Sequence, residues 1–261
     1  MSGLMATLVA VWVSGATPPG LGPEGRLLFE TAPQRLDARV GEWVTYQLDG
    51  GPQQGFLRLA VVGEQKDALG RDAVWMELEL GKHWELKAPL AQFLLLVARD
   101  LGLRRESVTR LFVAQGITKP QEVDQASLPA FLGPASPADP PSPPPPTSST
   151  LPAGPQSTVL RGKPTRLMTL AGTVLAEPLE VRHRQLVLKR YWMSRDVPLL
   201  HLAKIEFPAI KYSMEARDYG VDAKPRMVLP SPRDPKLVIE PGGAPPSPLP
   251  SESAPDKDPR P

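Results

Sequence analysis

The side chains that could do chemistry in this sequence are few and far apart. It contains three histidines, His83, His183 and His201, and no two of them have the spacing of metal ligands. His201 lies close enough to Asp196 to suggest a general base with its orienting carboxylate, but no serine in a nucleophile-elbow context accompanies them. The sequence therefore predicts a protein that is not an enzyme. A hydrolase would require the fold to bring His183 or His201 beside a serine or two carboxylates.

Cofactor-binding patterns are also absent from the sequence. Cysteine does not occur, which excludes disulfides and thiolate metal sites, and there is no dinucleotide fingerprint, phosphate-binding loop or HExxH pair. Two carboxylates, Glu77 and Glu79, share one face of a predicted strand. They alternate with the apolar Val74, Met76 and Leu78, so a solvated face is the favoured interpretation. We expect neither a cofactor nor a metal.

Charge and proline content limit the class of protein. Thirty Lys and Arg against 28 Asp and Glu give a net charge of +2, and no basic block exceeds two residues, which argues against nucleic-acid binding. Proline is concentrated in residues 133–157 and 224–261. These segments cannot bury enough apolar surface to offset chain entropy, so we predict a disordered insert and a disordered tail. The remainder, residues 38–132 and 158–223, is long enough to build one core.

The N-terminal residues suggest an exported protein. Residues 4–13 form an apolar run, and Ser14-Gly15-Ala16 places small residues where a signal peptidase cleaves, so residues 1–16 are predicted to be a signal peptide and residues 17–37 a linker. The run is too short to span a bilayer in the mature protein. A buried N-terminal strand or helix is the alternative. The lack of asparagine and the abundance of Pro, Ala, Arg and Gly suggest a GC-rich bacterial genome.

The first part of the domain, residues 38–132, contains strand patterns and one helix pattern. Apolar residues alternate with polar ones in residues 44–48, 57–61 and 74–80, which predicts a meander, and residues 108–114 predict a further strand. Pro89 followed by apolar residues at three- and four-residue spacing predicts the principal helix, residues 89–101. A second, short helix is expected at residues 126–132.

The second part, residues 158–223, is dominated by four predicted strands within residues 172–220. Residues 179–185 have one polar face, and His183 on the other is interpreted as a hydrogen-bonded core residue. Residues 186–194 and 199–207 carry bulky side chains on both faces, so a helix, a second sheet layer or an apolar ligand must cover both sides. We predict an α+β, mainly β fold, in which both parts form one curved antiparallel sheet with one principal helix packed on it.

One turn motif points to a family. Trp192-Met193-Ser194, followed by Val197-Pro198 and a strand with a lysine at residues 202–205, resembles a W-x-S-x-x-V-P turn of small exported bacterial β proteins. The order of strands, helix and long meander resembles the half-barrel of the outer-membrane lipoprotein carrier and its receptor. In that family the apolar concave side holds acyl chains beneath a helical lid. The resemblance implies that residues 89–101 are the lid and that six residues face a ligand: Leu94, Val97, Leu188, Trp192, Leu200 and Ile205.

These patterns predict a non-enzymatic, exported bacterial envelope protein that binds an apolar ligand or a lipidated partner in a half-barrel. The alternative is a structural or adaptor protein of the cell envelope, in which the sheet is only a folded core and the proline-rich segments contact an envelope partner. Neither hypothesis includes a nucleic-acid partner or a transmembrane segment in the mature form. Four tryptophans could line a ligand groove or fill a core, and the core is favoured: Trp43, Trp75, Trp84 and Trp192.

Overall fold

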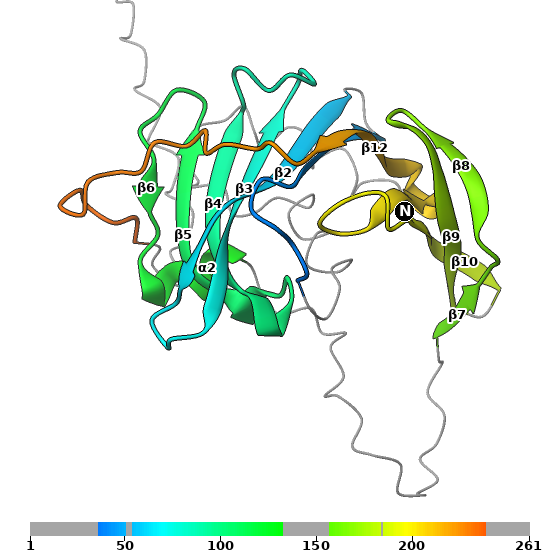
Figure 1. Ribbon diagram of the computed structural model, residues 1–261, viewed down its shortest axis with the longest axis horizontal. Coiled ribbons are helices and arrows are strands. Elements are labelled where there is room, and N and C mark those ends of the chain that lie inside the picture. Colours follow the sequence, from blue (N-terminus) through cyan, green and yellow to red (C-terminus); the bar gives the residue numbers. More distant parts are fainter. Residues whose placement is uncertain (1–35, 51–53, 133–156, 184, 239–261) are drawn as a thin grey trace, which may run out of the picture.

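A single antiparallel sheet dominates the computed structural model, which describes residues 36–50, 54–132, 157–183 and 185–238 (Figure 1). Its twelve strands lie in the order β6-β5-β4-β3-β2-β1-β12-β11-β10-β9-β7, with β8 paired to β9. The strands are β1 (Trp43–Asp49), β2 (Gly55–Lys66), β3 (Asp72–Gly81), β4 (Ala91–Ala98), β5 (Val108–Gln115), β6 (Gln121–Glu122), β7 (Ser157–Arg161), β8 (Thr165–Thr169), β9 (Gly172–His183), β10 (Leu186–Met193), β11 (Leu202–Phe207) and β12 (Tyr212–Gly220).

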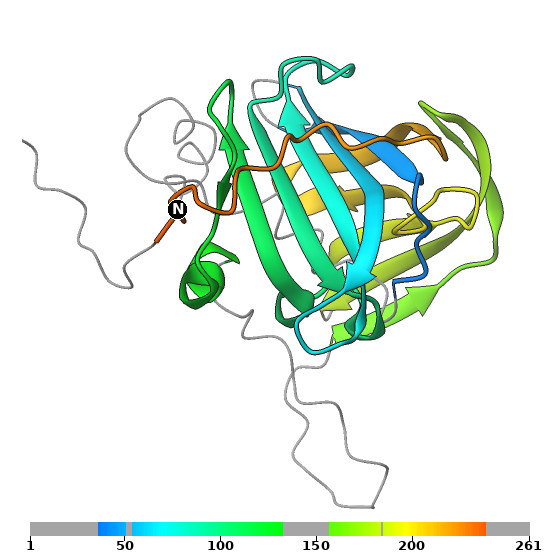
Figure 2. The same ribbon diagram turned by 60° about the vertical axis from the view of Figure 1, so that its left-hand side comes forward.

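Helical structure in the described part of the chain is short. The α-helix is α2 (Leu128–Leu132), and it continues directly from the 3-10 turn η4 (Gln125–Ser127), so the short helix predicted near residues 126–132 is confirmed. The other 3-10 turns are η2 (Arg99–Leu101), η3 (Arg105–Ser107) and η5 (Pro208–Ile210). Figure 2 shows a curved sheet with the short green helix at its margin, and the end strands β6 and β7 are not paired with each other. The predicted fold class, a mainly β protein with a curved antiparallel sheet and a helix, is confirmed.

The two parts of the domain meet at one strand pair. β1 from the first part pairs with β12 from the second, from Trp43 opposite Gly220 to Asp49 opposite Ser213. Strands distant in sequence are therefore neighbours at the centre of the sheet, and neighbouring strands along the chain extend outward from this pair on both sides. The predicted insert, residues 133–157, ends at the first residue of β7, Ser157, and its residues 133–156 lie outside the described residues.

The concave face carries the main core because alternate residues of each strand point to it. From β1 to β5 these residues include Tyr46, Leu59, Met76 and Phe93, all nearly or fully inaccessible to solvent. The helix α2 packs against them, and the ring of Phe131 meets Phe93 edge-on at 6.2 Å between centroids. The inner face is thus packed side chain against side chain at this half of the sheet.

The predicted principal helix, residues 89–101, is wrong. Residues 91–98 form β4, which pairs along its length with β3 and, with one register shift between Leu96 and Val97, with β5, and only the 3-10 turn η2 follows it. The apolar run extends through successive residues, so both faces of the segment are hydrophobic. A strand that is covered on both faces has this composition, and it also satisfies a three- and four-residue spacing.

The predicted disorder of residues 224–261 is wrong for their first part. Residues 223–238, which we call the strap, cross the convex face of the sheet from β1 toward β6, as the orange segment in Figure 2 shows. Ala223 donates its N–H to Gly41 at 2.8 Å, and Leu237 forms a parallel bridge with Val123 beyond β6. Residues 239–261 lie outside the described residues.

Candidate functional site

The six residues predicted to face a ligand do not come together. Val97, Leu200 and Ile205 point to the concave face and belong to the main core, each with no exposed surface. They contact other side chains of the protein and help to hold the sheet to the loop that follows β10. Because residues 89–101 contain a strand, no helical lid covers these residues from that part of the chain.

Leu94 lies on the opposite, convex face. It belongs to a small cluster with Phe112, Ala114 and Met227, the last of which comes from the strap. The reason is the period of two along a strand, which places residues separated by an odd number, such as Leu94 and Val97, on opposite sides. A helix would place Leu94 and Val97 on the same face, and the sequence pattern groups them because it predicts a helix there.

Leu188 and Trp192 lie on β10 and are half-buried. Trp192 pairs in register with Lys204, whose ammonium group lies 5.7 Å from the indole centroid, so the ring is on the convex side with that lysine. Leu188 lies at the irregularity in the β9–β10 pairing between Val187 and Lys189. Trp192 also packs against the edge of the main core, and no described residue of β10 is fully buried, so the cover of both faces stays a prediction.

The exposed part of the sheet is at its β7 end. We call residues 157–161, 177–183 and 186–193 the wing, and none of their described side chains is buried. The contrast with β3 is large, since eight of its ten residues are buried. The sheet is therefore covered on both faces around β3 and β4 and open at the wing.

An apolar row crosses from the core onto the wing along the concave face. Leu179 lies opposite Tyr191, Tyr191 opposite Ile205, Ile205 opposite Met214 and Met214 opposite Leu48, and residues opposite one another share a face. Leu48, Met214 and Ile205 are buried, whereas Tyr191 and Leu179 are half-exposed. Val181, two residues along from Leu179, extends the same surface. The row thus loses its cover as it leaves the core.

A buried polar cluster lies on the other face of the sheet, under the strap. Glu77 and Glu79 have no exposed surface, which shows that the prediction of a solvated face is wrong. The guanidinium of Arg58 lies 3.1 Å from Glu79 and 3.9 Å from Glu77, and that of Arg226 on the strap lies 3.0 Å from Glu79. Gln92 donates to Glu79 at 3.0 Å. Each carboxylate is thus paired with a charge or a hydrogen-bond donor.

The same carboxylates hold the strap through its backbone. Glu77 accepts the N–H of Met227 at 2.6 Å and the N–H of Arg226 at 3.1 Å. Met227 then packs on Leu94 and Phe112 of the sheet. No pattern in the sequence indicated this contact, because the strap residues are about 150 positions from the carboxylates in a segment whose proline content suggests disorder.

The environment of the cluster shifts its ionisation. Burial raises the pKa of Glu77, and the charge of Glu79 acts in the same direction, against the donors of Met227 and Arg226 and the charge of Arg58. Burial and the neighbouring Arg226 lower the pKa of Arg58. Protonation of Glu77 is therefore easier in the folded chain than in the unfolded chain.

The raised pKa of Glu77 predicts that the contribution of this residue to the free energy of unfolding depends on pH. A carboxyl whose folded pKa is raised stabilises the fold most below its ordinary pKa, and this contribution is lost as the pH rises through the raised value. We expect the free energy of unfolding of the wild type, minus that of Glu77→Gln, to fall as the pH rises from about 4 to about 8. Denaturant titrations of both proteins across this range measure the difference. A difference that is constant or rises with pH would contradict the shift.

The residues that could do chemistry are engaged in local turns. His201 contacts the carbonyl of Val197 through Nδ1 at 3.0 Å, and the hydroxyl of Ser194 donates to Asp196 at 3.4 Å. His183 is half-buried on β9. Across residues 36–50, 54–132, 157–183 and 185–238, no three His, Cys, Asp or Glu side chains gather closely enough to hold a metal ion. No helix in the described part of the chain has the length and apolar character needed to cross a bilayer.

A pocket of about 280 Å³ is lined by Trp84, Leu170, Arg217 and Asp218. The guanidinium of Arg217 lies 5.7 Å from the ring centroid of Phe56 and 5.6 Å from that of Trp84, and it donates to the side chain of Gln47 at 2.9 Å. The cation that could recognise an anion in this pocket is therefore already engaged by the protein.

Comparison with known proteins gives no family. No protein-family model and no curated protein matches the sequence. Among solved structures, MucB is 10% identical with a TM-score of 0.36, over 77% of this chain and 58% of MucB. MucB in complex with periplasmic MucA is 11% identical with a TM-score of 0.32, over 70% of this chain and 51% of that one.

A protein of Bacteroides fragilis, described as exported and with a YmcC-like fold, is 9% identical with a TM-score of 0.31. The match covers 71% of this chain and 98% of that one. TM-scores and identities this low establish neither a shared fold nor a shared function, so the resemblance to the lipoprotein carrier stays a prediction.

Proposed function

We propose that this protein is a non-enzymatic, exported envelope protein that binds an acyl chain, free or attached to a lipidated partner, on the concave face of its wing. The observation that carries the proposal is the apolar row that leaves the core at Ile205 and continues, half-exposed, through Tyr191 and Leu179. Export is supported by the apolar run of residues 4–13 before Ser14-Gly15-Ala16.

The chemistry of a sheet face favours an acyl chain over a peptide. Backbone N–H and C=O groups lie in the plane of the sheet and pair with neighbouring strands, so the face at Leu179 and Val181 offers side chains only. A peptide laid on this face would leave its own backbone groups unpaired, which is costly when water is excluded. A hydrocarbon chain has no such groups and gains about 0.8 kcal/mol for each methylene that it buries.

The position differs from that implied by the resemblance. Val97, Leu200 and Ile205 are enclosed by other side chains, whereas Leu179, Val181 and Tyr191 lie where the row is open. The ligand would therefore lie over β9 and β10, outward from the packed half of the sheet, and extend the apolar row that ends there.

Substituting one inward and one outward residue of β9 tests the proposal. We expect Val181→Ser to weaken binding of palmitate, and of a palmitoylated peptide, by about tenfold, because it removes apolar contact from the concave face. Arg182→Ser, on the opposite face of the same strand, should leave binding unchanged. Binding is measured by native mass spectrometry and by displacement of a fluorescent fatty acid.

The two probes separate the sources of the acyl chain, since a lipidated-protein site would hold the palmitoylated peptide more tightly than palmitate. Denaturant unfolding of both variants should show that each remains folded. Absence of any bound acyl species in the wild type, or equal binding by the wild type and Val181→Ser, would reject the proposal.

A further inference from the structure

The two edges of the sheet differ in whether another segment of the chain pairs with them. At the β6 end, the strap covers the edge: Leu237 donates its N–H to Glu122 at 2.7 Å, and Asp124 donates to the carbonyl of Leu237 at 2.8 Å. At the other end, β7 pairs with β9, and no other described strand pairs with its outer edge. One edge is therefore closed by backbone hydrogen bonds from the protein itself, and within the described residues the other is open.

The register shows which backbone groups of β7 point outward. Gly162, directly after β7, donates its N–H to Pro178 at 2.8 Å, so this residue is turned toward β9. Groups alternate along an antiparallel strand, and the pairing from Ser157 to Arg161 is regular. The N–H and C=O groups of Val159 and Arg161 therefore point away from β9, toward the open side.

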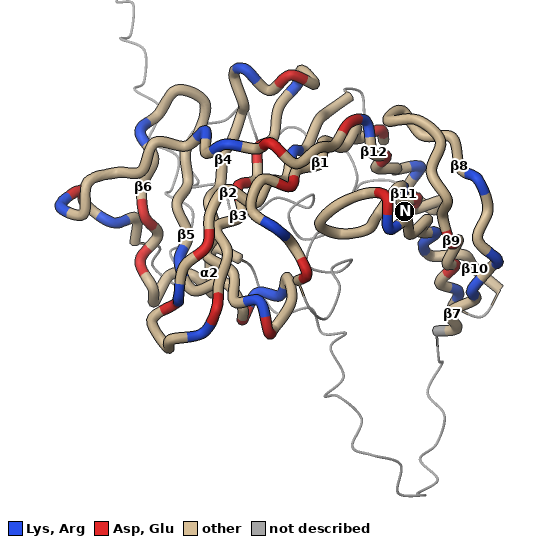
Figure 3. The backbone as a smooth tube through the Cα atoms, in the orientation of Figure 1, with Lys and Arg blue, Asp and Glu red and all other residues tan. Residues whose placement is uncertain are grey.

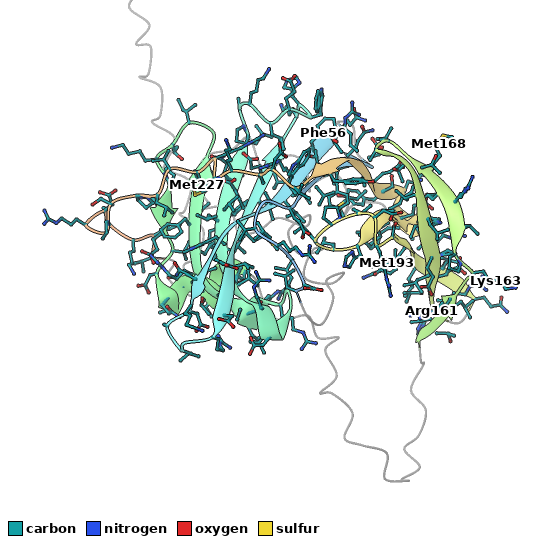
Figure 4. All side chains as sticks on the ribbon, viewed as in Figure 1. Phe56, Arg161, Lys163, Met168, Met193 and Met227 are labelled. Carbon is teal, nitrogen blue, oxygen red and sulfur yellow. The ribbon has the colours of Figure 1, made fainter. Side chains whose placement is uncertain are left out.

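The side chains along this edge are basic and apolar. Residues 157–169 contain Arg161, Lys163 and Arg166 and no acidic residue. Arg161 pairs with Glu177 at 2.9 Å, whereas Lys163 and Arg166 have no ion pair with any described residue. Val159 is 62% exposed. Figure 4 shows Arg161 and Lys163 at the outer margin of the molecule, and Figure 3 shows basic residues along the same margin at β8.

We propose that the outer edge of β7 and the adjoining β8 binds an extended, acidic and apolar segment of a partner protein by strand addition. An exposed strand edge is a template for pairing with another chain, and basic side chains on it decide which chain. A second copy of this edge would bring Arg161, Lys163 and Arg166 against their like, which repels. An acidic strand would instead place carboxylates opposite Lys163 and Arg166.

Synthetic peptides test this proposal on the full chain. A peptide of alternating Glu and Val, labelled for fluorescence anisotropy, is expected to bind, and its affinity should fall as salt is added, because the attraction between exposed charges is screened. A peptide of alternating Lys and Val should not bind. The Glu and Val peptide with N-methyl groups on alternate residues keeps its charge but loses the backbone donors on one edge, and it too should not bind.

Variants of the edge separate backbone pairing from charge. Val159→Pro removes the outward N–H and is tolerated at a strand edge, so it should weaken peptide binding at least about fivefold. Val159→Thr keeps the N–H and serves as the matched control. Exchanging both Lys163 and Arg166 for Glu should reverse the preference toward the Lys and Val peptide. Circular dichroism and unfolding midpoints confirm that each variant is folded.

Each remaining result would overturn the proposal. Binding that survives Val159→Pro or N-methylation would show that strand addition is not involved. A dimer of the full chain in sedimentation, lost in Val159→Pro, would assign the edge to a second copy. Binding to phosphatidylglycerol vesicles that survives Val159→Pro and is lost in the charge-exchanged variant would assign it to a membrane surface. Palmitate binding should be the same in the charge-exchanged variant and in the wild type, because Lys163 and Arg166 lie outside the wing, so this test stands apart from that of the acyl site.

Discussion

Replacing Glu77 with alanine is expected to lower the free energy of unfolding by about 3 kcal/mol and to release the strap from the sheet. Glu77 has no exposed surface and accepts backbone N–H groups from Met227 and Arg226 on the strap. Its loss leaves those donors without their acceptor and leaves the buried Arg58 with one carboxylate in place of two. Removing one member of a buried ion cluster costs about 3–5 kcal/mol, and the remaining Glu79 places this change at the lower end.

Two measurements follow the two parts of this prediction. Urea titration gives the change in unfolding free energy, and limited trypsin digestion gives the rate of cleavage after Arg226, which should rise as the strap detaches. Glu64→Ala is the matched control, because Glu64 forms an exposed pair with Arg99 at 3.3 Å and has no hydrogen bond or ion pair with the described residues of the strap. If cleavage after Arg226 is as slow in Glu77→Ala as in the wild type, the carboxylate does not anchor the strap.

The strap shows where composition misleads. Residues 223–238 contain four prolines and few large apolar side chains, and such segments usually cannot offset the entropy of ordering by themselves. Here the sheet supplies the partners: buried carboxylates that need donors, and an apolar spot at Leu94 and Phe112 that receives Met227. These partners are far away in the sequence, so a local reading of composition could not include them.

The second part of the chain was easier to predict. The four strands expected within residues 172–220 are β9 to β12. Alternation is informative when one face of a strand is wet, as in residues 179–185. In β4 both faces are covered, by the main core on one side and by the cluster of Leu94, Phe112 and Met227 on the other, so the alternation is lost. Periodicity alone then cannot separate a strand from a buried helix.

The predicted ligand residues follow the same division. The resemblance implies two ligand residues on β10, Leu188 and Trp192, and both lie in the open part of the sheet. The choice of Leu94 with Val97 depended on a helix, and the strand separates them onto opposite faces. Which inward residues are exposed depends on how far the core extends along the sheet, and this is a tertiary property that the pattern of one strand does not contain.

Replacing Phe93 with alanine is expected to cost about 3–5 kcal/mol of unfolding free energy, because it removes a fully buried ring from the packed half of the sheet. Phe93 lies between Leu78 on β3 and Val113 on β5, and its ring meets Phe131 of α2. The neighbouring strands and the helix cannot move far into the space left by the Phe93 ring, because their backbone hydrogen bonds hold them in place. The loss should therefore include a cavity as well as lost apolar contact.

Leu90→Ala is the matched control for this substitution, and the pair also tests where the ligand lies. Leu90 is 44% exposed in the turn before β4, so its truncation should cost far less than that of Phe93. In a helix over residues 89–101 the two residues, three apart, would share one buried face and cost similar amounts. If the space around Phe93 were a ligand pocket, its truncation would cost little and would change the affinity for palmitate. Denaturant titration and the fatty-acid displacement assay on the same two variants distinguish these outcomes. We expect Phe93→Ala to lose much stability and to keep its affinity for palmitate, because side chains of the protein fill this half of the sheet and the acyl chain binds on the wing.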